Sequence, residues 1–222
     1  MNKAQILQVL SLLPGATGET LVMILFSTIC AGMLGFPLGT LLYATSPGSL
    51  WPQELLYNLL SRIVNLFRAL PFIILMILLI PFTRFIVGTS IGPVAVIVPL
   101  SIGAAPFVAR VTESALQEID PGVILAARAM GSTNMQMIRK VLIPETMPAL
   151  ISNLALTIIT LIGYSAMAGA IGGGGLGALA INYGYYRFRT DVTVAAVIII
   201  LILVELVQFI GSRISRALLS KR

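Results

Sequence analysis

The chain has 222 residues, of which 58% are hydrophobic and only 10% are charged, and its formal net charge is +6. Soluble globular domains have about 25% charged residues, so this composition excludes an ordinary soluble domain. Nucleic-acid binding is also disfavoured, because the basic residues form no patch that is interleaved with aromatic side chains. A mean hydropathy of +1.01 indicates a membrane protein instead.

Windows of about 20 apolar residues, the length that crosses the hydrocarbon core, predict five membrane-spanning helices. They are 20–43, 55–82, 91–109, 147–171 and 192–210. Residues 1–18 precede them as an interfacial lead-in, because they lack a convincing signal-peptide cleavage site. Residues 212–222 follow as a basic tail. The sequence therefore predicts an all-α membrane protein with a single domain over 19–211.

Small residues and prolines mark the first three spans. The first span has small residues at four-residue intervals, at Ser27, Ala31, Gly35 and Gly39. Such a stripe allows another helix to approach closely, most simply one of the same subunit. The second and third spans contain Pro71, Pro81, Pro93, Pro99 and Pro106. We expect these spans to be kinked or locally unwound and to line a pathway, where freed backbone groups are tolerated.

Residues 120–144 interrupt the apolar pattern with signals for two short helices. Asp120 is a suitable N-cap of the first helix, with Pro121 at the first helical position. Gly131 suits the left-handed residue that ends this helix. The segment carries three basic residues, Arg128, Arg139 and Lys140. A hairpin of this kind outside the membrane is typical of a docking element for another subunit, and the alternative is an amphipathic connector that lies on the membrane surface.

The second helix of the hairpin also has marked ends. Thr133 and Gln136 have the spacing of a capping box. Pro144 is expected to stop the helix, because the residue before a proline disfavours helical backbone angles.

The fourth span carries candidate pathway residues among apolar neighbours, at Thr160, Tyr164, Ser165 and Met167. This modest polarity without charge disfavours a path for a sugar or a phosphate, which would show a more polar or cationic lining. In a homodimer, two flexible Met167 side chains near the axis would form an apolar gate. The alternatives are hydrogen bonds to neighbouring helices and, for Met167, simple packing.

The run Gly172–Gly177 contains a literal G-x-G-x-x-G, but it ends a membrane helix and follows no strand. A tight re-entrant turn is therefore the better interpretation than a dinucleotide site. The chain has no His, a single Cys and no clustered carboxylates, so we expect no catalytic residue and no metal site on it. Glu205 is the one acid in the middle of a span, and it is either functional, hydrogen-bonded at a helix contact, or silent.

The segment between the fourth and fifth spans is a candidate dock for an external protein. It contains Tyr185, Arg187 and Arg189, and aromatic residues and arginine are enriched at binding hot spots. The alternative is that these aromatics anchor the helices at the membrane interface.

The spacing within 120–144 also resembles a family motif. Ala126-Ala127, three residues, Gly131, nine residues and Val141-x-Ile143-Pro144 resemble the loop that ABC importer permeases present to their ATPase subunits. The family pattern begins with Glu, whereas this chain has Leu125. The resemblance implies a fold like that of type I importer permeases. It assigns the coupling loop to Ala126, Ala127, Arg128, Gly131, Val141, Ile143 and Pro144.

A cytoplasmic coupling loop would fix the topology, because five spans put the N-terminus outside and the C-terminus inside. The basic residues then sort ten inside and four outside, as the positive-inside rule requires. Inside are Arg62, Arg68, Arg110, Arg128, Arg139, Lys140, Arg213, Arg216, Lys221 and Arg222. Outside are Lys3, Arg84, Arg187 and Arg189.

Further segments resemble, in order and spacing, the permeases of methionine ABC importers over nearly the whole chain. They are Val64–Phe72, Ile80–Gly92, Ala104–Arg110, Gly163–Gly172, Gly174–Gly177 and Tyr183–Tyr185. The resemblance implies two copies of this subunit with two ATPase subunits, which bind ATP and Mg²⁺, and no cofactor on this chain. A periplasmic or lipid-anchored binding protein would deliver methionine for alternating-access transport across the bacterial inner membrane.

Other functions remain as alternatives. The nearest is an importer permease for another small amino acid or a peptide. A passive channel or a structural membrane scaffold would need no docking loop, so the hairpin disfavours both.

Overall fold

The computed structural model describes residues 3–220, so Met1, Asn2, Lys221 and Arg222 lie outside the described residues. Every regular element within 3–220 is helical, which confirms the all-α prediction. The elements are α1 (Lys3–Thr45), α2 (Glu54–Ala69), α3 (Phe72–Leu78), α4 (Ile80–Val87), α5 (Pro93–Gln117), α6 (Pro121–Ala129), α7 (Asn134–Met137), the π-helical η1 (Ile138–Leu142), α8 (Ile143–Ala168), the 3₁₀ turn η2 (Gly169–Ile171), α9 (Gly175–Leu179), the π-helical η3 (Ala180–Tyr185) and α10 (Thr190–Leu219).

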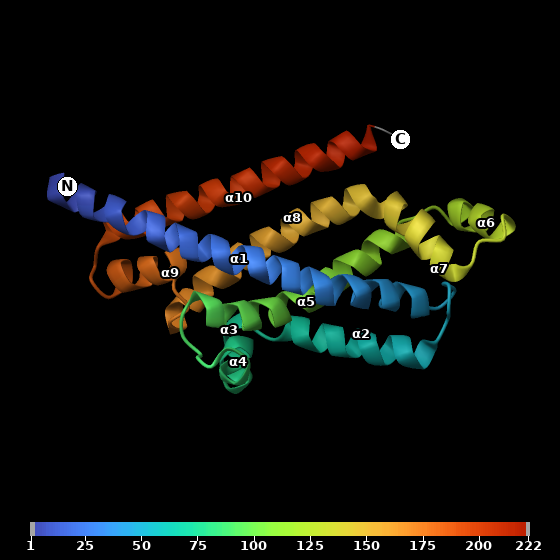
Figure 1. Ribbon diagram of the computed structural model, residues 1–222, viewed down its shortest axis with the longest axis horizontal. Coiled ribbons are helices and arrows are strands. Elements are labelled where there is room, and N and C mark those ends of the chain that lie inside the picture. The colour runs from blue at the N-terminus through green and yellow to red at the C-terminus, as the bar shows by residue number, and fades with distance from the viewer. Residues whose placement is uncertain (1–2, 221–222) are drawn as a thin grey trace.

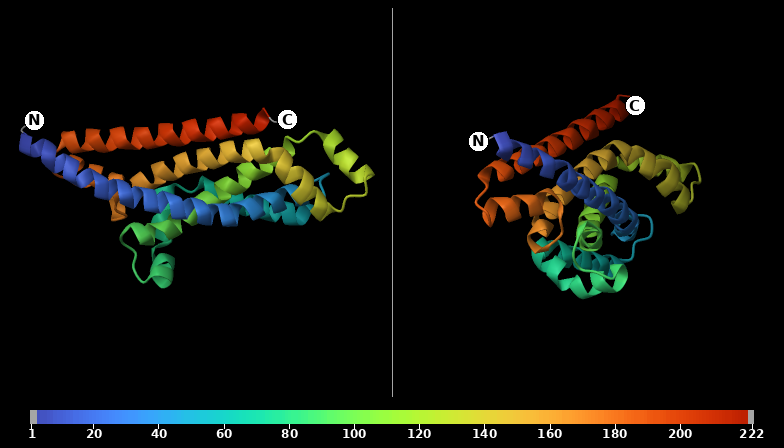
Figure 2. Two further views of the ribbon diagram at one scale, coloured as in Figure 1. Left: turned by 45° about the horizontal axis from the view of Figure 1, so that its top comes forward. Right: turned by 60° about the vertical axis from the view of Figure 1, so that its left-hand side comes forward.

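The chain runs along the long axis of the bundle five times. Four helices of the described residues are long and apolar enough to cross a membrane, and α2 with α3 forms a bent pair that makes a fifth crossing. α1 begins at one end of the bundle and α10 finishes at the other, beside α6 and α7 (Figure 1). Figure 2 shows the α6–α7 hairpin projecting from that end, which we call the hairpin end. Termini at opposite ends require an odd number of crossings, so the bent pair is one span and the five-span prediction agrees.

The small-residue stripe of α1 packs against α5 of the same subunit, as the simpler interpretation predicts. A Cβ atom added at Gly35 would lie 2.5 Å from the Ala105 carbonyl oxygen, and one at Gly39 would clash with the carbonyl of Ala109. Ala31 is fully buried. The two backbones therefore approach as closely as glycine allows.

The second span is broken, and the break is at a proline. α2 and α3 meet at an angle of 104°. Leu70 is extended, with ψ of 129°, and Pro71 caps α3, because a residue before proline avoids the helical region. The third span behaves differently, since α5 is continuous through Pro99 and Pro106. Both of these prolines are buried, so packing preserves a helix in which local unwinding was expected.

Pro144 does not stop the second hairpin helix, which corrects the prediction from sequence. α7 continues through η1 into α8, so residues 134–171 form one helical stretch of 38 residues. The Ile143 N–H donates to the Ile138 carbonyl, five residues back. The wider π turn accommodates the proline, whose missing N–H and bulky ring would otherwise interrupt an α-helix.

The outer spans extend beyond the apolar windows. α1 runs without a break from Lys3 to Thr45, so the expected lead-in is continuous with the first span. α10 reaches Leu219, so most of the expected basic tail is the last part of the fifth helix. Hydropathy windows miss these extensions because polar residues end the apolar run without ending the helix.

Candidate coupling hairpin and translocation path

The ends of α6 are fixed by local hydrogen bonds that the sequence predicts. Asp120 Oδ1 accepts a hydrogen bond from the Gly122 N–H at 2.6 Å. At the other end, Gly131 has a φ of 76°. The Ser132 N–H donates to the Ala127 carbonyl at 3.1 Å, which is the longer bond of a Schellman motif. Gly131 therefore turns the chain sharply between the two helices.

The capping box of α7 is also present. The Thr133 N–H donates to Gln136 Oε1 at 2.9 Å, and the Gln136 N–H donates to Thr133 Oγ1 at 3.3 Å. Two otherwise unpaired N–H groups of the helix start are satisfied in this way. The hairpin thus has a defined shape before it meets any partner.

The hairpin is packed onto the α1–α2 loop and the end of α5. Its inner face joins a buried cluster of Tyr43, Leu50, Leu116, Ile119, Ala127, Met137, Ile138 and Leu142. Asn134 Nδ2 donates to the Leu50 carbonyl at 2.9 Å, and Arg128 reaches the Ser49 carbonyl at 3.4 Å. The hairpin therefore moves with the body of the subunit.

Several apolar side chains of the hairpin are exposed, and together we call them the hairpin patch. It consists of Val123, Leu125, Ala126, Met130 and Met135, all exposed. Leu125 is 64% exposed and Met130 78%. An exposed apolar surface of this kind, next to the exposed Arg139 and Lys140, is typical of a protein interface. Leu125 contributes apolar area here.

The predicted coupling residues divide into two groups. Ala126, Arg128, Gly131 and Pro144 are exposed and can reach a partner. Ala127 is buried, and Val141 and Ile143 pack against the cluster beneath the hairpin. The second group therefore supports the surface and does not form it.

A charge network between α2 and α5 was missed by the sequence reasoning. Glu113 is 1% exposed and accepts a hydrogen bond from Arg110 Nη1 at 2.7 Å. Arg110 Nη2 also donates to Ser61 Oγ at 2.9 Å and to Asn65 Oδ1 at 2.8 Å. The spacing of three residues between Arg110 and Glu113 was the available signal. The network neutralises Arg110 within the subunit.

Tyr164 lines a cavity between α2, α3, α5 and α8, which we call the inner cavity. The Tyr164 and Phe72 rings stack with centroids 4.3 Å apart and planes inclined by 2°. The cavity has a volume of about 150 Å³ and is lined by Phe67, Arg68, Leu70, Phe72, Leu75, Gly103, Phe107 and Tyr164. The structure thus pairs the predicted Tyr164 with an aromatic residue that sequence reasoning did not select.

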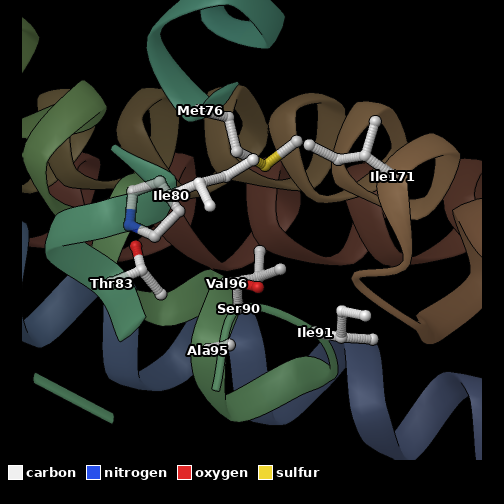
Figure 3. Close-up of a pocket in the computed structure, with 9 residues that line it drawn as sticks. Met76, Ile80, Thr83, Ser90, Ile91, Ala95, Val96 and Ile171 are labelled. Atoms are coloured by element: carbon white, nitrogen blue, oxygen red, sulfur yellow. The ribbon is translucent and has the colours of Figure 1, made fainter. Parts of the chain in front are cut away.

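A second cavity, the outer cavity, lies between α3, α4, the start of α5 and η2 (Figure 3). Its volume is about 250 Å³, and it is lined by Met76, Ile80, Thr83, Ser90, Ile91, Ala95, Val96, Pro99 and Ile171. Thr83 is 3% exposed, and its hydroxyl has no hydrogen-bond partner among the described residues. Phe72 and Met76 of α3 contribute to the inner and outer cavities respectively, so α3 separates the two.

The other predicted pathway residues lie on different faces of α8. Met167 is 49% exposed and shares a face with Thr160 and Gly163. A Cβ atom added at Gly163 would meet nothing within 4 Å, so this face is open in the single subunit. Ser165 is buried and donates to the Ile162 carbonyl. Ser165 therefore lines neither cavity.

The glycine run forms the re-entrant turn that the sequence predicts. Gly172, Gly174 and Gly175 have positive φ, and α9 folds back against α8. Side chains of α1 hold the start of α9. Glu19 Oε2 accepts from the Gly175 N–H at 2.6 Å, and Thr20 Oγ1 accepts from the Leu176 N–H at 2.9 Å.

The candidate external dock lies at the same end as α9. Tyr185 is exposed, and the Arg187 guanidinium lies 4.4 Å from the centroid of the Tyr183 ring. Arg189 donates two hydrogen bonds to Asp191, at 2.9 and 2.7 Å. Arg187 and Tyr185 are thus better placed than Arg189 to meet a partner.

Comparisons with known proteins extend over nearly the whole chain. The probable D-methionine transport system permease protein MetI of Vibrio cholerae is 45% identical over 205 residues, which cover 92% of this chain and 91% of that protein. The D-methionine transport system permease protein MetI of Escherichia coli K12 is 56% identical over 151 residues, 68% of this chain and 70% of that protein.

A solved structure of the MetNI methionine ABC transporter in an inward-facing conformation has the same fold. It matches with a TM-score of 0.92 at 50% identity and covers 98% of this chain and 99% of that chain. Residues 35–221 match the family described as binding-protein-dependent transport system inner membrane component. With the hairpin, the five passes and these relatives in agreement, the chain belongs to the family of inner membrane components of binding-protein-dependent transport systems.

Proposed function

We propose that this chain is the permease subunit of an ATP-driven importer that carries methionine across the bacterial cytoplasmic membrane by alternating access. The hairpin is the observation that carries the proposal, because a passive channel or a scaffold needs no capped, packed docking element with exposed apolar side chains. Methionine is supported by similarity over 92% of the chain to a probable D-methionine permease. The runner-up is an importer permease for another small amino acid or a peptide.

The working complex contains two copies of this chain and two ATPase subunits, which dock on the hairpin patches and bind ATP and Mg²⁺. A periplasmic or lipid-anchored methionine-binding protein docks at the opposite end, at Tyr185, Arg187 and Arg189. The hairpin end is cytoplasmic in this arrangement, and the start of α1 is external. This chain forms the translocation path, and the ATPase subunits hydrolyse ATP.

The path runs beside the open face of α8. Thr160 and Met167 line it where the two copies meet, Tyr164 lines it from the inner cavity, and the buried Ser165 supports α8 behind them. Thioether and aromatic side chains suit an apolar substrate, because sulfur and aromatic rings attract each other.

The test is uptake by the reconstituted complex. The chain is co-purified with the products of neighbouring genes and placed in proteoliposomes with the binding protein outside and ATP inside. We expect uptake of radiolabelled methionine that requires ATP and is competed by unlabelled methionine in preference to a panel of other amino acids. Equal uptake without ATP would indicate a channel, and preferred competition by another amino acid would favour the runner-up.

A further inference from the structure

Arg68 lies within the second membrane span, although the charge count from the sequence assigned it to the cytoplasmic side. It lies in the last turn of α2, directly before the break at Pro71. It lines the inner cavity together with Gly103, which is 10 residues after the start of α5 at Pro93 and 14 before its end at Gln117. Arg68 is therefore level with the midpoint of α5, where charged side chains are costly unless they meet an opposite charge or a wet path.

Within the described residues the Arg68 guanidinium has no hydrogen-bond or ion-pair partner, unlike Arg110, which is neutralised by Glu113. The C-terminal end of α2 offers a favourable partial charge, but it supplies no anion. Arg68 is also exposed in the subunit. The guanidinium is thus available for an anion that enters the cavity.

Most of the other residues that line the cavity are aromatic, and the remainder are Leu70, Leu75 and Gly103. Phe67, Phe72, Phe107 and Tyr164 surround the space beside Arg68. A guanidinium binds a carboxylate through two parallel hydrogen bonds, and aromatic rings attract a thioether sulfur. The outer cavity has no charged residue in its lining, so a carboxylate finds a counter-charge only on the inner side of α3.

We propose that the inner cavity is a substrate-binding site within the permease. Arg68 binds the carboxylate of the transported amino acid there, and the Phe72–Tyr164 stack contacts its apolar side chain. The volume of about 150 Å³ is below the roughly 300–1,000 Å³ of sites for drug-sized ligands, which suits one small amino acid better than a peptide. The assignment rests on the proposed function and adds the location of the site and its anion-binding group.

The test uses the complete complex in proteoliposomes and a diazirine analogue of methionine that keeps the carboxylate and carries the photoreactive group in the side chain. After illumination during ATP-driven uptake, mass spectrometry locates the attached label. We expect it on the peptides that contain Phe72 and Tyr164. In Arg68→Gln we expect labelling and methionine uptake to fall about tenfold or more, because the charge-assisted pair with the carboxylate is lost.

Arg62→Gln is the matched control, because it removes an exposed cation from the same helix without touching the cavity. Labelling and uptake within about twofold of wild type are expected for it, as for a surface change. Arg68→Lys keeps the charge but not the paired hydrogen bonds, so an intermediate loss is expected.

Three results would overturn the assignment. They are wild-type label outside the inner cavity, unchanged labelling in Arg68→Gln, or complete recovery of uptake in Arg68→Lys, which would indicate a purely electrostatic role at the end of α2. If Arg68→Gln fails to assemble, the wild-type label position and Arg68→Lys decide the question. Absence of methionine uptake by the wild-type complex would instead refute the proposed function.

Discussion

At Gly131 the backbone has a φ of 76°, and a Cβ atom added there would meet nothing within 4 Å. A substitution therefore acts through the backbone conformation and not through a clash. A β-branched residue in the left-handed region costs about 1–3 kcal/mol, so Gly131→Val should distort the turn between α6 and α7. We expect weaker association with the ATPase and severalfold lower uptake, with normal insertion into the membrane.

Gly131→Asn is the matched control. Asparagine tolerates the left-handed region and is found, after glycine, at the position that directly follows a helix C-cap. It should keep most of the uptake. Normal substrate-stimulated ATP hydrolysis in Gly131→Val would contradict the role of the hairpin as the coupling element.

Single residues were predictable where their partners are close in the sequence. Asp120, Gly131 and the pair Thr133 and Gln136 each act within a few residues, and the structure confirms all of them. Glu19 was not predictable, because the Gly175 N–H that it accepts from is 156 residues away. Phe72 was missed for the same reason, since its stack with Tyr164 depends on how α3 meets α8.

Among the helices, α8 offers a test of the gate. Met167 lies on the open face of α8 with Thr160 and Gly163. If two copies meet along this face, Met167→Ala removes a flexible apolar plug and leaves the fold of each subunit intact, because the side chain is half exposed. We expect normal assembly, with raised uncoupled leakage of methionine or raised basal ATP hydrolysis.

Leu154→Ala is a suitable control, because it trims a side chain of similar exposure on another face of the same helix. Proteoliposomes with Met167→Ala that match wild type in uptake, leakage and basal hydrolysis would place the gate elsewhere, with the Phe72–Tyr164 stack as the next candidate.

Helix boundaries were less predictable than helix identity. The apolar windows found the cores of α1, α5, α8 and α10, because burial in lipid demands long apolar runs. The same windows treated 55–82 as one segment and could not give the 104° bend between α2 and α3. At Pro144 a local rule was overridden, since packing of Ile138 and Leu142 in the buried cluster favours a π turn over a helix end.

For the whole molecule, five passes predict opposite exposure of the two ends. In a Cys30→Ser background, Gln5→Cys and Ser220→Cys are introduced separately and treated in intact cells with a membrane-impermeant thiol reagent. We expect Gln5→Cys to be labelled and Ser220→Cys to be protected until the cells are opened, because the positive-inside rule places the hairpin end in the cytoplasm. Labelling of both, or of Ser220→Cys alone, would contradict this orientation.

The continuous helix from Asn134 to Ile171 has a mechanical consequence. At a rise of about 1.5 Å per residue, its 38 residues form a rod of roughly 57 Å. The rod carries the start of α7 at one end and Tyr164 and Met167 near the other. If an ATPase pair pushes on the hairpin, we expect the displacement to reach Tyr164 and Met167 as a tilt or rotation of this one helix. The π turn at Ile138–Leu142 sets the angle and the relative rotation between α7 and α8.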